Sequence, residues 1–354
     1  MREPEIIETF DCFGSACAAV VIGAAPERSA REAAQHARRS LRAWHERFSR
    51  FSPHSELSSL NGDVRRVVPV SPLMALFANV VAIAGSLSCG LVDATLIDQI
   101  EAAGYAGELT QPLPLPIALW LAPARRAAGP SAAQGWRAIE VDLDEGTVRR
   151  PPGIKLDSGG LAKGLFADVL AEQLAAHPNF AINCAGDLRI GGAGGVVRPI
   201  EVESPFDGST LHTFRMRRTG VATSGIGRRA WLDASGRPAH HLLDPSTGRP
   251  AYTGVVQVTA LAPNALMAEI QAKAAVLSGP RAARGWLPHG GVIVLDDSSH
   301  EVIEPPGRRG LPVAPQSTSR PTPARAAPGA PGPMPKAMAR RTVSSSAGSG
   351  REMK

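Results

Sequence analysis

Two adjacent glycines lie between an extended segment and a helical segment, an arrangement that suits phosphate binding. Residues 157–164 read Asp-Ser-Gly-Gly-Leu-Ala-Lys-Gly. Because glycine has no side chain, the backbone can approach a ligand closely there, and the free N–H groups of the following helix favour an anion. Lys163, in the first turn of that helix, could reach the same anion. Purely structural turns of this kind are common, and the segment matches neither the P-loop nor the dinucleotide fingerprint, so both readings stay open.

A second turn is entered by two histidines. His240 and His241 precede residues 244–248, which read Asp-Pro-Ser-Thr-Gly. That run is an ordinary turn formula and needs no function to explain it. The formula does not explain the histidines, and a histidine can act as a general base near neutral pH. A lone histidine is more often structural, so this pattern makes His241 a candidate base but does not establish that role.

Small and polar residues end two further extended segments. Residues 222–225 read Ala-Thr-Ser-Gly, and residues 183–187 read Asn-Cys-Ala-Gly-Asp. Each segment is weak evidence alone. Together with the two turns above they indicate one ligand site built by several loops.

The elements that must hold these turns follow from periodicity and capping residues. Apolar residues at three-four spacing predict helices over 30–48, 72–87, 161–174 and 265–278. Ser71-Pro72 and Asn264 are typical helix starts, and Ser278-Gly279-Pro280 is a typical helix end. Extended segments are expected at 154–157, 180–184, 254–261 and 291–295. This alternation predicts a mixed α and β domain, but it does not give the strand order.

The positive net charge of the chain lies in its C-terminal end. The formal charge is +6, yet residues 307–354 hold nine basic side chains and one acidic one, so the rest is slightly acidic. We therefore expect no nucleic-acid surface on the folded part. From about Pro305 the sequence is rich in Pro, Ala, Arg and Ser and poor in aliphatic residues, which predicts a disordered tail over 305–354 and a folded domain over 1–304.

The cysteines and the N-terminus favour an intracellular protein. Cys12, Cys17, Cys89 and Cys184 show no CxxC pairing and read as reduced, mostly buried thiols. The start, Met1-Arg2-Glu3-Pro4-Glu5, is unlike a signal peptide, and the longest apolar stretch, 16–25, is too short to span a bilayer. We expect a cytoplasmic enzyme with no membrane partner.

In sequence order, these segments resemble the FAD:protein FMN transferase family, the ApbE type. The resemblance covers about Phe10 to Ile303. The segments that carry it are Phe13–Ser15, Phe48–Asn61, Val92–Thr95, Asp157–Gly164, Asn183–Asp187, Ala222–Gly225, His241–Gly248 and the helix that begins after Asn264.

The resemblance implies a fold and a reaction. The fold would be a single α+β domain of mixed, mainly antiparallel sheets flanked by helices. The reaction would split FAD, transfer its FMN half to a Ser or Thr of an acceptor flavoprotein, and release AMP. His241, as the base for the incoming hydroxyl, and Asp244 would be catalytic. The FAD pocket would be lined by Phe13, Phe51, Asn61, Leu91, Val92, Asp93, Asp157, Lys163, Thr223, Ser224 and Leu243.

The chain departs from the family pattern on its last helix. Members typically carry Ala-Asp-x-x-x-Thr there, and the Asp and Thr hold Mg²⁺ together with a carbonyl of the glycine turn. This chain has Glu269 and Lys273 instead, and an ammonium cannot ligate a metal. The metal positions implied are Gly160, Glu269 and Lys273, the last as a position only. Helical spacing also puts Lys273 on the buried side, where it could pair with Glu269.

Three hypotheses follow. The first is an active flavin transferase with FAD as donor substrate. The second is an FAD-binding protein or slow FAD pyrophosphatase that has lost transfer with its metal site, as Lys273 would favour. The third is a structural or interaction protein on the same scaffold.

Overall fold

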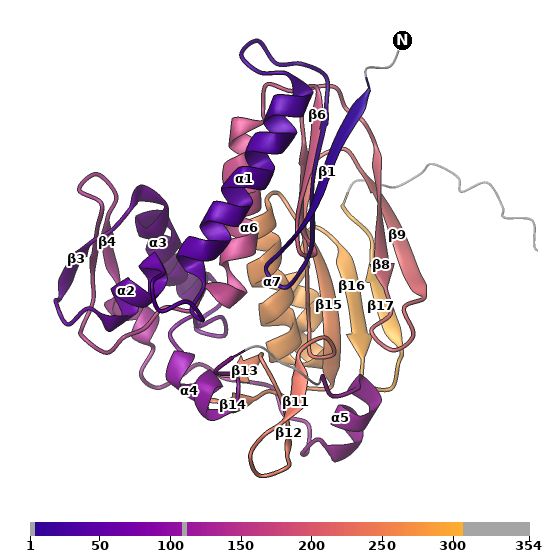
Figure 1. Ribbon diagram of the computed structural model, residues 1–354. Helices are drawn as coiled ribbons and strands as arrows, with labels where there is room; N and C mark the ends of the chain where they lie inside the picture. The colour runs from indigo at the N-terminus through magenta and orange to yellow at the C-terminus, as the bar shows by residue number, and fades with distance from the viewer. Residues whose placement is uncertain (1–3, 108–111, 307–354) are drawn as a thin grey trace, which may run out of the picture. The chain divides into compact units, whose positions relative to one another are not determined.

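An antiparallel sheet of eight strands organises the fold (Figure 1). The computed structural model describes residues 4–107 and 112–306. Each strand of the main sheet runs antiparallel to its neighbours. In order across the sheet the strands are β1 (Glu5–Cys12), β2 (Ser15–Ile22), β6 (Asn179–Cys184), β7 (Asp187–Gly191), β10 (Thr219–Gly225), β15 (Val255–Ala262), β16 (Gly291–Leu295) and β17 (His300–Ile303).

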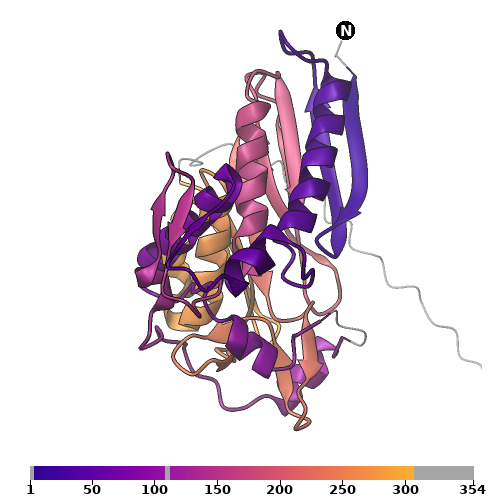
Figure 2. The same cartoon turned by 60° about the vertical axis from the view of Figure 1, so that its left-hand side comes forward.

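Long helices cover one face of this sheet, as Figures 1 and 2 show from two sides. Helix α1 (Ala30–Phe48) lies on β1 and β2, α6 (Ala162–Gln173) on β6 and β7, and α7 (Ala265–Ser278) on β10 and β15. Their fully buried residues include Leu41, Phe166 and Ile270, which belong to one apolar cluster with the strand residues Ile182 and Cys184. Burial of these apolar side chains is the main force that holds the helices on the sheet.

The helix ends follow the capping signals in the sequence. Ser71 caps α3 (Pro72–Leu87) by accepting a hydrogen bond from the Met74 N–H, and Pro72 occupies the first turn. Asn264 caps α7 in the same way through the Met267 N–H, 2.8 Å away. The helix ends at Gly279, whose φ of 78° is in the left-handed region that glycine tolerates. These predicted boundaries are confirmed.

Smaller elements surround the sheet. One group, α2 (Glu56–Gly62) with α3 and a sheet of β3 (Val67–Pro69), β5 (Thr147–Arg149) and β4 (Glu140–Asp142), shares the apolar cluster of α1 and α6. The remaining elements are α4 (Ile97–Ala102), α5 (Leu115–Leu121), α8 (Pro280–Ala283), the hairpin β8 (Arg198–Glu203) and β9 (Thr210–Met216), the pair β11 (Ala230–Leu232) and β12 (Pro238–His240), the pair β13 (Leu243–Asp244) and β14 (Arg249–Pro250), and 3₁₀ turns at Gly135–Ala138, Ser158–Gly160 and Arg284–Trp286.

The α+β class, the antiparallel sheet and the four predicted helices are confirmed, but one predicted strand is wrong. Residues 154–157 belong to no sheet. Their backbone is held instead by the Asn61 side chain at Leu156 and by the Ala94 carbonyl at Asp157. The predicted tail lies outside the described residues from 307 onward. No helix in the described part of the chain is long and apolar enough to cross a membrane.

Candidate functional site

A cavity of about 530 Å³ opens where the C-terminal end of α1, the turn before α6 and the segment after β12 meet. This volume lies in the range of small-ligand pockets. It brings together residues from segments far apart in the chain, including most of those singled out in the sequence. The predicted residues that line it are Phe13, Phe51, Leu91, Val92, Asp93, Asp157, Gly160, Lys163, His241, Leu243 and Lys273.

Phe13 is placed by the tight turn between β1 and β2. Phe13 and Gly14 form a two-residue hairpin, and both have positive φ, 57° and 71°. A phenylalanine in the left-handed region is uncommon and costs free energy. Its ring is held edge-on to His45 at 5.0 Å and tilted on Phe166 at 5.9 Å, so the strained turn presents a fixed aromatic wall to the cavity.

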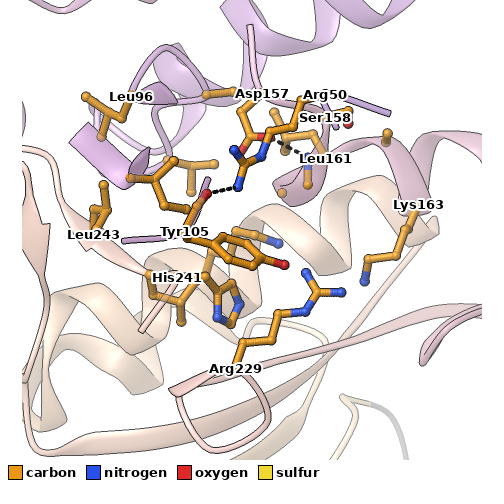
Figure 3. A pocket seen from close by; sticks show the side chains of 18 of the residues that line it. Arg50, Leu96, Tyr105, Asp157, Ser158, Leu161, Lys163, Arg229, His241 and Leu243 are labelled. Atoms are coloured by element: carbon orange, nitrogen blue, oxygen red, sulfur yellow. Dashed lines mark hydrogen bonds and ion pairs between the residues drawn. The ribbon is translucent and has the colours of Figure 1, made fainter. Parts of the chain in front are cut away.

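Arg50 organises an aromatic side of the pocket (Figure 3). Its guanidinium lies over the rings of Phe51 and Tyr105, 4.3 and 4.8 Å from their centroids, and donates to the Tyr105 carbonyl at 2.5 Å. Its Nε lies 3.7 Å from the Asp157 carboxylate. Phe51 as a whole residue is 43% exposed. The cluster therefore offers an open π face beside a fixed positive charge.

The glycine turn forms the polar end of the same cavity. Residues 158–160 make one 3₁₀ turn before α6, and the Asp157 carboxylate caps it by accepting from the Gly159 N–H at 3.1 Å. The Ser158 hydroxyl donates to the Phe48 carbonyl at 2.7 Å, which ties the turn to the end of α1. The turn is thus rigid, and it leads directly into the N-terminal end of α6, where the helix dipole favours negative charge.

Cationic side chains face this end. Lys163 Nζ lies 2.5 Å from Asp187 Oδ2. Burial alone would lower the pKa of Lys163, but the carboxylates of Asp187 and Glu269 raise it above 10.5, so the ammonium stays charged. Figure 3 shows the Arg229 guanidinium between Lys163 and His241, pointing into the same space. These cationic side chains favour an anionic ligand at this end of the cavity.

His241 is a neutral imidazole at the edge of the cavity. Burial, reinforced by the positive charge of Arg229, holds the pKa of His241 well below its usual 6.5. The ring is half-buried: it borders the cavity while its Nδ1 is enclosed and has no hydrogen-bond partner among the described residues. A neutral imidazole can accept a proton at neutral pH, as a general base must.

Asp93 carries a second buried atom without a partner. Its Oδ1 accepts from the Thr95 N–H at 2.9 Å and from the Thr95 hydroxyl at 2.6 Å. Its Oδ2 is buried and has no partner among the described residues. Burial raises the pKa of Asp93. Because an unpaired buried oxygen is costly, this atom is a natural contact for a ligand N–H or O–H.

The position of the predicted metal site holds an ion pair. Lys273 Nζ lies 3.1 Å from Glu269 Oε1, which confirms the predicted i,i+4 pair, and Glu269 Oε2 accepts from the Gly164 N–H at 3.0 Å. Both carboxylate oxygens are therefore engaged. No group of three His, Cys, Asp or Glu in the described part of the chain is placed to share an ion. These residues do not fit Mg²⁺.

Five predicted site residues do not line the cavity: Glu269, which holds Lys273 as described above, and Asn61, Thr223, Ser224 and Asp244. Asn61 holds the backbone of Leu156 through both ends of its amide. Thr223 pairs with the Thr259 hydroxyl at 2.8 Å, and Ser224 is buried in β10. Asp244, predicted as catalytic, accepts from Ser246, Gly129 and Arg126, so its carboxylate shapes the turn after β13. Asn61 and Asp244 thus hold backbone segments next to lining residues, whereas Thr223 and Ser224 lie in β10 and are not among the lining residues.

Three of the lining side chains that the sequence analysis did not predict, Arg50, Tyr105 and Arg229, are cationic or aromatic and belong to the site described above. Arg50 lies within the segment Phe48–Asn61 and directly precedes Phe51, which the sequence analysis did predict. Tyr105 comes from the loop after α4, and no local pattern marks it. Arg229 comes shortly after the segment Ala222–Gly225, and two adjacent arginines, Arg228 and Arg229, so close to a candidate segment are a local signal that could have identified it.

Comparison with known proteins shows which family the chain resembles. A model of the ApbE family matches residues 13–295. The FAD:protein FMN transferase of Rhodobacter capsulatus is 28% identical over 312 residues, which cover 84% of this chain and 56% of that protein. The enzyme of the same name from Escherichia coli strain K12 is 25% identical over 232 residues, 64% of this chain and 65% of the relative.

The fold also has solved counterparts. The crystal structure of an ApbE protein from Thermotoga maritima superposes with a TM-score of 0.68 at 24% identity, over 85% of this chain and 97% of the other. This likeness concerns the fold. The chain spans less than two thirds of the length of the two relatives named above.

Proposed function

Since the chain belongs to the ApbE family, we propose that it transfers the FMN half of FAD to a Ser or Thr hydroxyl of an acceptor flavoprotein and releases AMP. The observation that carries this proposal is that one cavity is lined by aromatic side chains, by the glycine turn with nearby cationic side chains, and by the neutral His241. A flavin, a pyrophosphate and an incoming hydroxyl are the three groups that such a reaction must hold.

The aromatic side suits the ring systems of FAD. The rings of Phe13, Phe51 and Tyr105 come from three separate segments and border the cavity. Aromatic and apolar surface of this kind binds flat heterocycles by burial and stacking. The unpaired Asp93 Oδ2 would accept a hydrogen bond from a ring N–H or a ribose hydroxyl and so fix the orientation of the bound molecule.

The polar end suits the pyrophosphate. Lys163, Arg229 and the N-terminal end of α6 supply positive charge on one side of the cavity. Phosphoryl transfer depends on positioning and on neutralisation of charge at the phosphate oxygens, and these groups provide both. Because Glu269 and Lys273 do not fit Mg²⁺, no step of the mechanism is assigned to a metal.

His241 would take the proton of the acceptor hydroxyl. The acceptor oxygen attacks the phosphorus of the FMN half, and the bond from that phosphorus to the bridging oxygen breaks. AMP leaves with the bridging oxygen and the electrons of that bond. The proton of the hydroxyl passes to the imidazole, whose low pKa keeps it unprotonated beforehand.

Incubation with FAD and candidate acceptor proteins tests the proposal. We expect the acceptor to gain one FMN less one water by mass spectrometry, on a Ser or Thr, with AMP formed in equal amount. Substitution of that Ser or Thr by Ala should abolish the gain. An acceptor set that stays unmodified while FAD remains intact would contradict the transferase assignment.

A second candidate is supported by the Glu269–Lys273 ion pair, which stands where the resemblance to the family implies metal ligands. A chain without the metal could bind FAD and hydrolyse it slowly to FMN and AMP. Release of both nucleotides without acceptor, at a rate that acceptor proteins do not change, would favour this reading over transfer.

A further inference from the structure

The Lys273 side chain packs against the glycine turn at Gly160. A Cβ atom added at Gly160 would lie only 3.1 Å from Lys273 Cε, so the absence of a side chain at Gly160 makes room for the lysine. The Lys273 side chain is 13% exposed, and it lines the cavity. A long cationic side chain is thus held at the edge of the segment that we expect to meet phosphate.

The hydrogen bonds of Lys273 leave it free to bind an anion. One of its three N–H donors goes to Glu269 Oε1 at 3.1 Å, and no other acceptor is found for it in the described ranges. Glu269 is anchored on its other side by the Gly164 N–H. The carboxylate therefore positions the ammonium from behind and leaves its remaining donors unpaired.

The charges around this point have an excess of cations. Asp187 balances Lys163 and Glu269 balances Lys273, while Arg229 faces the same space. A divalent cation would meet the Lys273 ammonium at the position where it needs an oxygen ligand, and the two charges would repel. The same ammonium would attract phosphate oxygens.

We propose that the Lys273 ammonium is a built-in substitute for the divalent cation and binds the pyrophosphate of FAD at the glycine turn, so that this chain binds FAD without added metal. The inference rests on the proposed function, because it assigns a role to Lys273 in the same donor site. Lys273 is then a binding residue, held in position by Glu269.

The first test compares ligands and metals on the full chain. Affinities for FAD and for riboflavin, which lacks phosphate, are measured by calorimetry in EDTA and in excess Mg²⁺. We expect FAD to bind more tightly than riboflavin in EDTA, with less than about a twofold change on addition of Mg²⁺. Strong FAD binding that appears only with Mg²⁺ would overturn the inference and leave the proposed function standing. Equal affinity for FAD and riboflavin under both conditions would contradict the proposed function itself.

The second test removes the charge while the shape is kept. The double variant Glu269→Gln/Lys273→Met keeps an acceptor for the Gly164 N–H and leaves no buried charge unpaired. Because a hydrogen bond to a charged group is worth more than a neutral one, its FAD affinity should fall roughly tenfold or more in EDTA. Riboflavin affinity and the melting temperature should change little. Unchanged FAD affinity in a folded variant would show that Lys273 only pairs with Glu269.

A third variant restores oxygen ligands. In Glu269→Asp/Lys273→Thr the ammonium is replaced by a hydroxyl, so FAD binding should weaken in EDTA and recover on addition of Mg²⁺. If this variant is folded and binds riboflavin but its FAD affinity does not change on addition of Mg²⁺, then Lys273 is not the group that excludes the metal.

Discussion

At the scale of single residues, the proposed reaction would depend on the His241 imidazole being neutral before it accepts a proton. His241→Gln removes the base while it keeps a polar side chain of similar length. We expect FAD affinity within a few-fold of the parent chain, and a transfer rate lower by roughly 10² or more. The measurement is the initial rate of acceptor flavinylation at saturating FAD.

The pH profile provides the control for this assignment. The pKa of His241 is held well below 6.5, so the imidazole stays unprotonated as the pH falls from 8 through 6.5. The rate of the parent chain should therefore stay flat across that range and decline only in more acidic solution. A variant that loses FAD but keeps its turnover per bound flavin would make His241 a pocket residue and not a base.

Asp93 gives a second prediction, because only one of its two carboxylate oxygens is hydrogen-bonded among the described residues. Its Oδ1 holds Thr95, and its buried Oδ2 is unpaired among the described residues. Asp93→Ala should weaken FAD binding roughly tenfold, the value of one hydrogen bond to a charged group. Thr95→Val, which removes only the hydroxyl bonded to Oδ1, is the matched control and should cost less. If calorimetry shows a larger loss of FAD affinity for Thr95→Val than for Asp93→Ala, then Asp93 Oδ2 does not contact the ligand.

At the scale of elements, the site depends on how closely α6 and α7 approach. A Cβ at Gly164 would lie 2.8 Å from Leu266 Cα and 2.9 Å from the Ala265 carbonyl oxygen, both of them backbone atoms. Gly164→Ala should force the helices apart and lower the free energy of unfolding by about 1–3 kcal/mol. FAD affinity should fall as well, because Lys163 and Lys273 lie on these two helices.

Gly62 provides the matched control for that substitution. It is the last residue of α2, and an added Cβ would meet nothing within 4 Å. Gly62→Ala should leave stability unchanged or slightly raised, since alanine favours helix. Chemical denaturation of both variants decides the point. Equal stabilities would mean that α6 and α7 can move apart at Gly164 without a measurable cost.

The elements also show what a sequence can predict. The Ser71-Pro72 start and the Asn264 cap are local signals, because capping depends on residues within one turn, and both helices begin there. Whether residues 154–157 form a strand depends on a partner elsewhere in the chain, and the Asn61 side chain takes that place. Tyr105 could not be predicted for the same reason, because only the fold brings its loop to the cavity. Lys163 and His241 could be predicted from local patterns, since Lys163 follows two adjacent glycines at a helix start and His241 belongs to a pair of histidines before a turn.

At the scale of the whole molecule, the folded part should not need the C-terminal end of the chain. The last strand of the main sheet ends at Ile303, and residues 307–354 contain few aliphatic residues. Deletion of 307–354 should leave the melting temperature within about 2 °C and FAD affinity within twofold, because too little apolar surface is removed to change the core. Thermal unfolding and calorimetry measure both. Aggregation of the shortened chain, or loss of flavin binding, would assign the tail a structural role.

The order of strands in the main sheet has a consequence for how the chain is made. The hairpin β1–β2 is synthesised first, but Ala18 on β2 pairs with Asn183 on β6, about 165 residues later. At ribosomal speeds of about 5–20 residues per second, that partner emerges on the order of ten seconds after the hairpin. Until then the edge of β2 that pairs with β6 has no partner for its backbone N–H and C=O groups. Folding of this sheet is therefore a late, long-range event, and the nascent chain should be most prone to aggregate before β6 has left the ribosome.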